Sequence, residues 1–486
     1  MKRLLQMPCV RKVARCGAVL IAALLMSVHA AGAVRASGPL TVHRENPRYF
    51  ADATGKAVFL TGSHTWANIQ ERGIEGITPD FDYGQYLDFL VAHHHNFTRL
   101  WAWQHAQWMA FAPADTPIRY KPLPYLRTGP DLARDGKPKF DLHQWDEAYF
   151  RRLRERVRAA GERGIYVCVM LFNGWELDNR NKHQQRNGNA WLGHPLHRDN
   201  NISGIDGNPS GNDTGREIYT LEVPEVTRLQ EAFVRKMIET VNDCGNVIYE
   251  ICNEAHERSG PWQQHMIDFV RACEAKLPRQ HLVGMTGWPI KRPELMASSA
   301  DWIAPPVHAN QYLKLAPNDG AKISVVDTDH VDPLRSDYTR PWRCFMQGHH
   351  FLLMDNYRDV RYAAPSRPDP LFEAERLAMG VIRQLADRVD LARLKPQPEL
   401  ASTGYCLANP AVQYIVFRAD ESTNPVELEL PTGEYQVEWI LPITGDSRGR
   451  STVTTTGEKA RLVSPTAGAV ALLLTALGGP AGSVAH

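Results

Sequence analysis

Short apolar runs alternate with longer amphipathic stretches through most of this chain. Eight of the runs have the length and composition of buried strands, and the stretches between them follow the 3.6-residue repeat of helices. The strands of a closed parallel barrel are covered on both faces, so this alternation predicts a (β/α)8 TIM barrel of the α/β class. The predicted strands are residues 58–61, 97–101, 165–172, 247–252, 282–286, 302–307, 323–326 and 351–354, and the predicted helices are 81–92, 145–163, 225–241, 262–277 and 371–391.

The pattern changes near residue 395. Pro396 and Pro398 end the helical repeat, and short alternating strands follow at 412–417, 426–430, 436–440, 451–455 and 470–474, separated by turn signals. This spacing predicts a small all-β antiparallel sandwich. We therefore expect a barrel at residues 37–395, a C-terminal β-sandwich at 396–478 and a disordered tail at 479–486.

One connection of the barrel is unusually long and polar. Residues 173–221 are rich in Asn, Gly, Asp and His. An insertion of this length without regular structure is functional or a linker. Because it follows the third predicted strand, we expect it to overhang the barrel mouth and form one wall of a cleft; the alternative is a surface loop without ligand contact.

The first 36 residues have the features of a secretory signal peptide. A basic segment precedes an apolar run too short to span a bilayer, and small residues follow at candidate cleavage positions. We therefore expect a secreted or periplasmic protein. Six of the eight cysteines would remain after cleavage; their spacing matches no zinc pattern, and a disulfide stays open.

Composition narrows the possible partners. The net charge of +1 argues against nucleic acid, and no later apolar run is long enough to cross a membrane. No glycine-rich phosphate loop follows a strand, so no organic cofactor is expected. The chain has 12 Trp and 16 Tyr, whose flat rings can pack against sugars or fill a core. We expect an oligo- or polysaccharide partner, and the oligomeric state is left open.

The clearest chemical signal is the segment Val-Ile-Tyr-Glu-Ile-Cys-Asn-Glu-Ala-His at 247–256, in which Asn253 and Glu254 end a buried strand. Active sites of TIM barrels lie at the carboxyl ends of the strands. Glycoside hydrolysis requires two carboxyl groups flanking the bond, one of them protonated. Glu254 is therefore a candidate general acid/base, and Asn253 a candidate ligand of a sugar hydroxyl. The alternative role for Glu254 is capping the next helix.

These residues resemble a known group of enzymes. Asn253-Glu254, with Arg99 at the end of the second strand, is similar to the clan of retaining (β/α)8 glycosidases that includes cellulases and mannanases. A closer resemblance, to bacterial apiosidase-like and cellulase-like proteins, implies a glycosidase of varied substrate. It rests on Arg48-Tyr49-Phe50, Leu60 through Trp66, His194-Pro195 with Asn200-Asn201, Tyr249-Glu250, and the Trp439-x-x-Pro442-x-x-Gly445 turn, which resembles a C-terminal domain described as collagen-binding-like.

The second carboxylate departs from this clan, whose nucleophile is a Glu closing the seventh strand. Here that strand continues into Asp327-Thr328-Asp329-His330. Strand alternation places Asp327 and Asp329 on one face. We expect Asp329 to be the nucleophile or base, with Asp327 as its orienter or substitute. The alternative is that both are structural, capping the next helix or pairing with Arg99. An Asp is shorter than a Glu, so retention and inversion stay open.

Further candidates lie at or after predicted strand ends. Arg99 is expected to fix a carboxylate, and His308 to bind hydroxyls where the clan often has a histidine. Three adjacent histidines, 93–95, more simply end a helix than bind metal. The alternative functions are a non-catalytic carbohydrate-binding protein on a degenerate barrel and a metal-dependent hydrolase. The remaining substrate-binding candidates are His64, Trp66, Trp101, Trp103, Trp175, His330 and Asp355.

Overall fold

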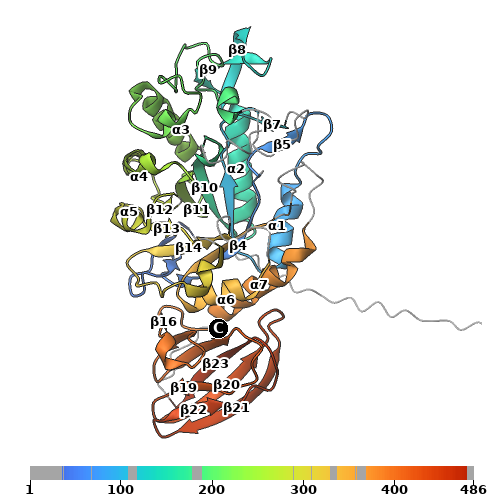
Figure 1. Ribbon diagram of the computed structural model, residues 1–486, viewed down its shortest axis with the longest axis vertical. Helices are drawn as coiled ribbons and strands as arrows, with labels where there is room; N and C mark the ends of the chain where they lie inside the picture. Colours follow the sequence, from blue (N-terminus) through green and yellow to red (C-terminus); the bar gives the residue numbers. More distant parts are fainter. Residues whose placement is uncertain are drawn as a thin grey trace, which may run out of the picture. The chain divides into compact units, whose positions relative to one another are not determined.

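A parallel eight-stranded sheet forms the centre of the molecule (Figure 1). The computed structural model describes residues 36, 38–66, 68–107, 118–177, 189–287, 289–307, 309–328, 336–355, 357 and 368–478. The sheet order is β4-β15-β14-β13-β12-β11-β10-β6, and every neighbouring pair is parallel. This order confirms the predicted barrel. Its strands are β4 (Thr61–His64), β6 (Phe97–Trp101), β10 (Tyr166–Asn173), β11 (Val247–Asn253), β12 (Val283–Thr286), β13 (Trp302–Ala304), β14 (Ile323–Asp327) and β15 (His350–Met354).

The sheet comes close to closing where β4 approaches β6. The Asn96 amide oxygen accepts the Thr61 N–H at 3.0 Å, and the Thr98 hydroxyl donates to the Ser63 carbonyl at 2.9 Å. A Cβ on Gly62 would lie 1.9 Å from the Phe97 carbonyl oxygen. Only glycine allows two backbones to approach this closely. Gly62 is thus a requirement of barrel closure.

Helices cover the outer face of the sheet. Two of them begin at aspartates whose side chains accept backbone N–H groups: Asp82 from Gln85 and Asp146 from Ala148. All five predicted helices are present; two more, of six and eight residues, are too short for their repeat to be detected. The helices are α1 (Tyr83–Ala92), α2 (Glu147–Gly161), α3 (Pro224–Val241), α4 (Gly260–Glu274), α5 (Arg292–Ala297), α6 (Thr339–Met346) and α7 (Glu373–Asp387).

Two ribbons and a long connection are inserted after the first three barrel strands. β5 (Glu71–Ile74) pairs with β7 (Ile118–Lys121), and β8 (Tyr125–Leu132) forms a hairpin with β9 (Pro138–Trp145). None of these strands was predicted. A small sheet of β1 (Thr41–Val42), β2 (Phe50–Ala51) and β3 (Ala57–Val58) precedes the barrel.

The connection after β10 is more ordered than its composition predicted. Its described residues include three 3₁₀ helices, Trp175–Leu177, Ala190–Gly193 and Arg216–Tyr219. The Asn201 amide donates to three loop carbonyls and accepts the Ile205 N–H. The expectation of a segment without regular structure was therefore wrong, because buried side-chain amides replace the missing backbone pairing.

The C-terminal region is all-β and antiparallel, as predicted (Figure 1). The strands missed in the prediction are the short ones at Lys395–Pro396, Cys406–Asn409 and Lys459–Leu462. A six-stranded sheet runs in the order β16 (Lys395–Pro396), β17 (Cys406–Asn409), β18 (Gln413–Arg418), β23 (Val470–Leu477), β20 (Gly433–Ile440) and β21 (Ser447–Thr455), and β19 (Val426–Glu429) pairs with β22 (Lys459–Leu462).

This β region shares a hydrophobic core with the last two barrel helices. Trp342 of α6 stacks on Phe417 of β18, with ring centroids 5.1 Å apart and planes at 14°, and its indole N–H donates to the Pro442 carbonyl at 3.0 Å. The Trp439-x-x-Pro442-x-x-Gly445 turn thus contacts the barrel. Residues 34–486 form one compact unit, so the proposed boundary at 395/396 stays a prediction.

Two sequence expectations concern the membrane and the cysteines. Among the described residues, no helix has both the length and the apolarity to cross a bilayer. The six cysteines in the described part of the chain form no disulfide, and all are buried.

Candidate active site

Polar side chains converge at the carboxyl ends of the barrel strands. Arg99 lies within β6, and β4, β10, β11 and β14 end in His64, Asn173, Asn253 and Asp327. All five residues are at most 4% exposed. A barrel gathers such strand ends on one face, where enzymes of this fold carry their active sites.

Asp327 is held from two sides. One carboxylate oxygen accepts a hydrogen bond from the Arg99 guanidinium, and the other lies 3.3 Å from His64 Nε2. These contacts fix the orientation of the carboxylate. Arg99 therefore contacts a strand-end carboxylate, as the sequence predicted, and that carboxylate is Asp327.

The protonation state of His64 follows from its neighbours. The Trp101 indole N–H donates to His64 Nδ1 at 3.0 Å. An indole nitrogen can only donate, so Nδ1 is unprotonated and Nε2 carries the proton given to Asp327. Burial lowers the pKa of His64 below its usual value of 6.5, even though Asp327 opposes the shift. His64 is thus a neutral donor to the carboxylate.

A second buried carboxylate, missed in the sequence, lies on the other side of Arg99. Glu250, in the middle of β11, is fully buried, and its Oε2 is 2.9 Å from Arg99 Nη2. The Cys168 thiol donates to Glu250 at 3.2 Å, and the Thr286 hydroxyl also donates to it. Burial acts against the charge of Arg99, but Asp327 and Glu250 together outweigh it and raise the pKa of Arg99. The signal in the sequence was a glutamate inside an otherwise apolar strand.

Glu254 follows the end of β11 in an uncommon backbone conformation. Its φ is +42°, in the left-handed region, and the residue is 8% exposed. Such a conformation costs a non-glycine residue about 1–3 kcal/mol and is concentrated at functional sites. Favourable interactions of the surrounding fold therefore offset this cost and hold the carboxylate directly after Asn253.

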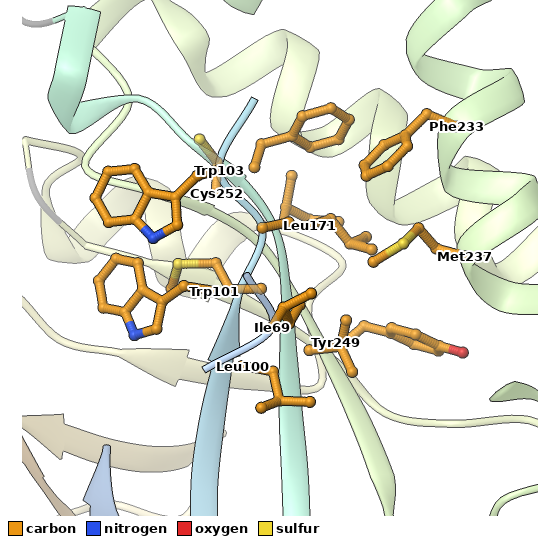
Figure 2. Close-up of a cluster of buried hydrophobic side chains, with 14 of the residues drawn as sticks. Ile69, Leu100, Trp101, Trp103, Leu171, Phe233, Met237, Tyr249 and Cys252 are labelled. Atoms are coloured by element: carbon orange, nitrogen blue, oxygen red, sulfur yellow. The ribbon is translucent and has the colours of Figure 1, made fainter. Parts of the chain in front are cut away.

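The tryptophans near the strand ends pack mainly on one another. Trp101 and Trp103 have rings 5.9 Å apart and nearly parallel, at 14° (Figure 2). Both are 1% exposed, and Trp66 is 6% exposed. The three rings therefore pack on one another, and their contacts with a sugar stay a prediction. The ring centroids of Trp175 and Trp66 are 5.4 Å apart. Trp175 is partly exposed and keeps an accessible surface.

Figure 2 also shows how the strands carrying these rings are supported. Tyr249 and Leu171 lie toward Phe233 and Met237 of α3, whereas Trp101 and Trp103 lie on the other side of the strands. Helix α3 thus packs against β10 and β11 on the face opposite the two tryptophans.

The remaining predicted residues fall into two groups. Asp355 is fully buried, and its two oxygens accept from Arg376 at 2.6 and 2.7 Å. This ion pair fixes Asp355 to Arg376 of α7, and its contact with a sugar hydroxyl stays a prediction. His308, Asp329 and His330 lie outside the described residues.

A separate cavity of about 330 Å³ lies between the two inserted ribbons. Its walls include Arg72, Arg119, Tyr120, Arg127 and Phe140. None of the described site candidates lines it. The chemistry at the strand ends therefore belongs to a different place from this cavity.

Comparison with known proteins supports the architecture. Residues 112–288 match the family described as a domain of unknown function, DUF6298. A glycoside hydrolase family 5 structure from Bacteroides vulgatus has 12% identity and a TM-score of 0.58 over 90% of this chain and 93% of that one. Another structure, named as a glycoside hydrolase, has 12% identity and a TM-score of 0.57 over 90% and 97%. No curated protein sequence matches the chain.

These similarities define the class by fold. The chain has the barrel architecture of the family 5 glycoside hydrolases, with the β region after it. At 12% identity the likeness does not carry over a substrate. The residues at the strand ends, and not the fold, carry the chemistry that specifies a function.

Proposed function

We propose that this protein is a glycoside hydrolase in which Glu254 is the general acid/base and Asp327 the second carboxylate. The main support is the convergence of Arg99 and His64 on Asp327, at the end of the seventh barrel strand. A carboxylate with both oxygens held is pre-positioned to act without reorganisation. Asp329, first favoured from the sequence, is the alternative and is included in the test.

The proposed reaction uses the two carboxyl groups on opposite sides of the bond. Protonated Glu254 donates its proton to the leaving oxygen as the bond from that oxygen to the anomeric carbon breaks. Asp327 then either bonds to the anomeric carbon or takes a proton from a water that does so. In the first route a water, deprotonated by Glu254, then displaces Asp327 from the anomeric carbon, and the two displacements together retain the configuration; in the second route the single displacement inverts it. The shorter side chain of Asp, compared with Glu, favours room for a water and thus inversion.

The finer assignment rests on the sequence resemblance. We infer an apiosidase-like glycosidase acting on oligo- or polysaccharide fragments, in the cell envelope or medium. The signal-peptide pattern of residues 1–36 supports export. Mass spectrometry of the N-terminus of protein recovered from periplasm or medium tests this, with cleavage after Ala30, Ala33 or Ala36 expected; an intact Met1 in exported protein would contradict it.

The test of the proposed function is cleavage of aryl pyranosides and furanosides, with product anomers followed by NMR. We expect Glu254→Gln and Asp327→Asn each to lower kcat about 100- to 10,000-fold on the substrate that the wild type cleaves. Asp329→Asn should keep most of the rate. Glu147→Gln, at an exposed ion pair with Lys236, is the matched control and should match the wild type.

Each outcome decides between the candidates. If Asp329→Asn loses the rate and Asp327→Asn keeps it, the assignment of the second carboxylate is wrong. If chelation abolishes activity, the metal-dependent hydrolase is correct. If the wild type cleaves nothing but binds glycans on an array, the protein is a carbohydrate-binding protein.

A further inference from the structure

Two asparagines at adjacent strand ends form a buried pair next to Glu254. Asn173 ends β10 and Asn253 ends β11, and the two residues are register partners in the sheet. They are 1% and 3% exposed. The Asn253 amide nitrogen donates to the Asn173 amide oxygen at 3.3 Å.

Backbone contacts fix which way both amides face. The Trp175 N–H donates to the Asn173 side chain at 3.2 Å, so the atom facing it is the oxygen. The Asn253 atom that faces the same oxygen must then be its nitrogen. The Asn173 nitrogen and the Asn253 oxygen are therefore the two atoms left over.

Neither leftover atom has a hydrogen-bond partner within the described ranges. Buried polar atoms without partners are rare, because each loses its hydration without compensation. One of these atoms is a donor and the other an acceptor. A hydroxyl group, which both donates and accepts, complements the two together.

We propose that Asn173 is a specificity-determining residue: its leftover amide N–H binds the same hydroxyl of the sugar unit adjacent to Glu254 that Asn253 is already expected to contact. This inference rests on the proposed function, because it takes the ligand of the barrel mouth to be a sugar. A buried water has the same hydrogen-bonding chemistry. The test therefore has to separate a hydroxyl of the substrate from a resident water.

The experiment combines deoxygenated substrates with substitutions at Asn173. The probes are the aryl glycoside that the wild type cleaves and its monodeoxy analogues, one for each hydroxyl. We expect the wild type to cleave one analogue roughly 10- to 100-fold less efficiently than the parent, as for a lost hydrogen bond in a site built for it. In Asn173→Ala and Asn173→Asp, the parent should slow while that analogue changes little, so the ratio of their kcat/KM values approaches one.

A structural asparagine provides the control. Asn246 is 4% exposed at the other end of the β11 segment, where its amide donates to the Val157 and Ile165 carbonyls. We expect Asn246→Ala to lower thermal stability and to leave the ratio between parent and analogue at its wild-type value. If Asn173→Ala slows the parent and every analogue equally, the pair holds water or serves the fold, and the inference is wrong.

Binding separates this inference from the proposed function. Calorimetry with the Glu254→Gln variant measures the affinity for the same sugars without turnover. If the wild type binds sugars but cleaves none, hydrolysis is disproved, and the loss of affinity in Asn173→Ala for one hydroxyl still tests the pair. If the protein neither cleaves nor binds any sugar of the panel, both proposals are overturned.

Discussion

At the residue scale, the core beneath the site contains a buried cation that pairs with two buried carboxylates. Arg99 lies between Asp327 and Glu250, all three at most 4% exposed. Burying an ion pair is costly, so such groups are retained where they hold something in place. Here the guanidinium holds Asp327, and Glu250 with Thr286 and Cys168 holds the guanidinium.

Removing Glu250 should therefore destabilise the protein strongly. We expect Glu250→Ala to lower the free energy of unfolding by about 3–5 kcal/mol, because Arg99 loses one of its two carboxylates in a buried setting. Urea unfolding followed by tryptophan fluorescence measures this. Glu147→Ala, which removes an exposed partner of Lys236, should cost no more than about 1 kcal/mol. Equal effects of the two substitutions would show that Glu250 is not the support of Arg99.

At the element scale, the turn after β20 joins the β region to the barrel. Its Pro442 carbonyl accepts a hydrogen bond from the Trp342 indole of α6. Gly445 has a φ of +75°, and a Cβ added to it would lie 3.3 Å from a methyl group of Val381 in α7. The sequence marked this turn only by its resemblance to a collagen-binding-like domain. In this chain its contacts are with α6 and α7.

Replacing Trp342 by a smaller ring should weaken the contact between the β region and α6. We expect Trp342→Phe to lower the free energy of unfolding by about 2 kcal/mol, from the lost hydrogen bond to Pro442 and part of the stack on Phe417. Differential scanning calorimetry measures the shift in Tm.

Trp302→Phe is the matched control for this prediction. Trp302 is fully buried, and its indole nitrogen has no hydrogen-bond partner in the part of the chain that the structure describes. The same loss of volume should therefore cost less there. A larger loss at Trp302 than at Trp342 would mean that packing volume, and not the junction, sets the stability.

At the scale of the whole molecule, several histidines are buried in the neutral form. Burial lowers the pKa of His95, His194 and His350 to about 3, and that of His349 to about 4. In the unfolded chain a histidine titrates near 6.5. Below that pH the unfolded state binds protons that the folded state excludes, so stability falls as the pH falls.

Acid should consequently unfold this protein from about pH 6 downward. Each of the four histidines contributes a slope of about 1.4 kcal/mol per pH unit between pH 6 and 4, and no stability is lost above the unfolded pKa. Urea unfolding at pH 7, 6 and 5 measures the slope. His349→Asn should make the slope of stability against pH shallower by about 1.4 kcal/mol per pH unit, because one proton fewer is taken up on unfolding. A stability that stays flat from pH 7 to 5 would disprove the prediction.

The sequence by itself determined the barrel, the antiparallel C-terminal region, and the strand-end positions of Asn253 and Asp327. These features follow from local information, since periodicity marks a strand and strand ends of a parallel barrel share one face. The short β5 and β7 and the short helices α5 and α6 were missed because they have too few residues for a period.

Only the tertiary structure decided which partners meet. Three sets of contacts join residues from different strands: Asp327 with Arg99 and His64, Glu250 with Arg99 and Thr286, and Asn173 with Asn253. Sequence spacing carries no information on such pairs, because they depend on the register between strands and on closure of the sheet. Burial of Trp66, Trp101 and Trp103 was undecided for the same reason: a ring at a strand end faces solvent or core according to the segments that pack over it.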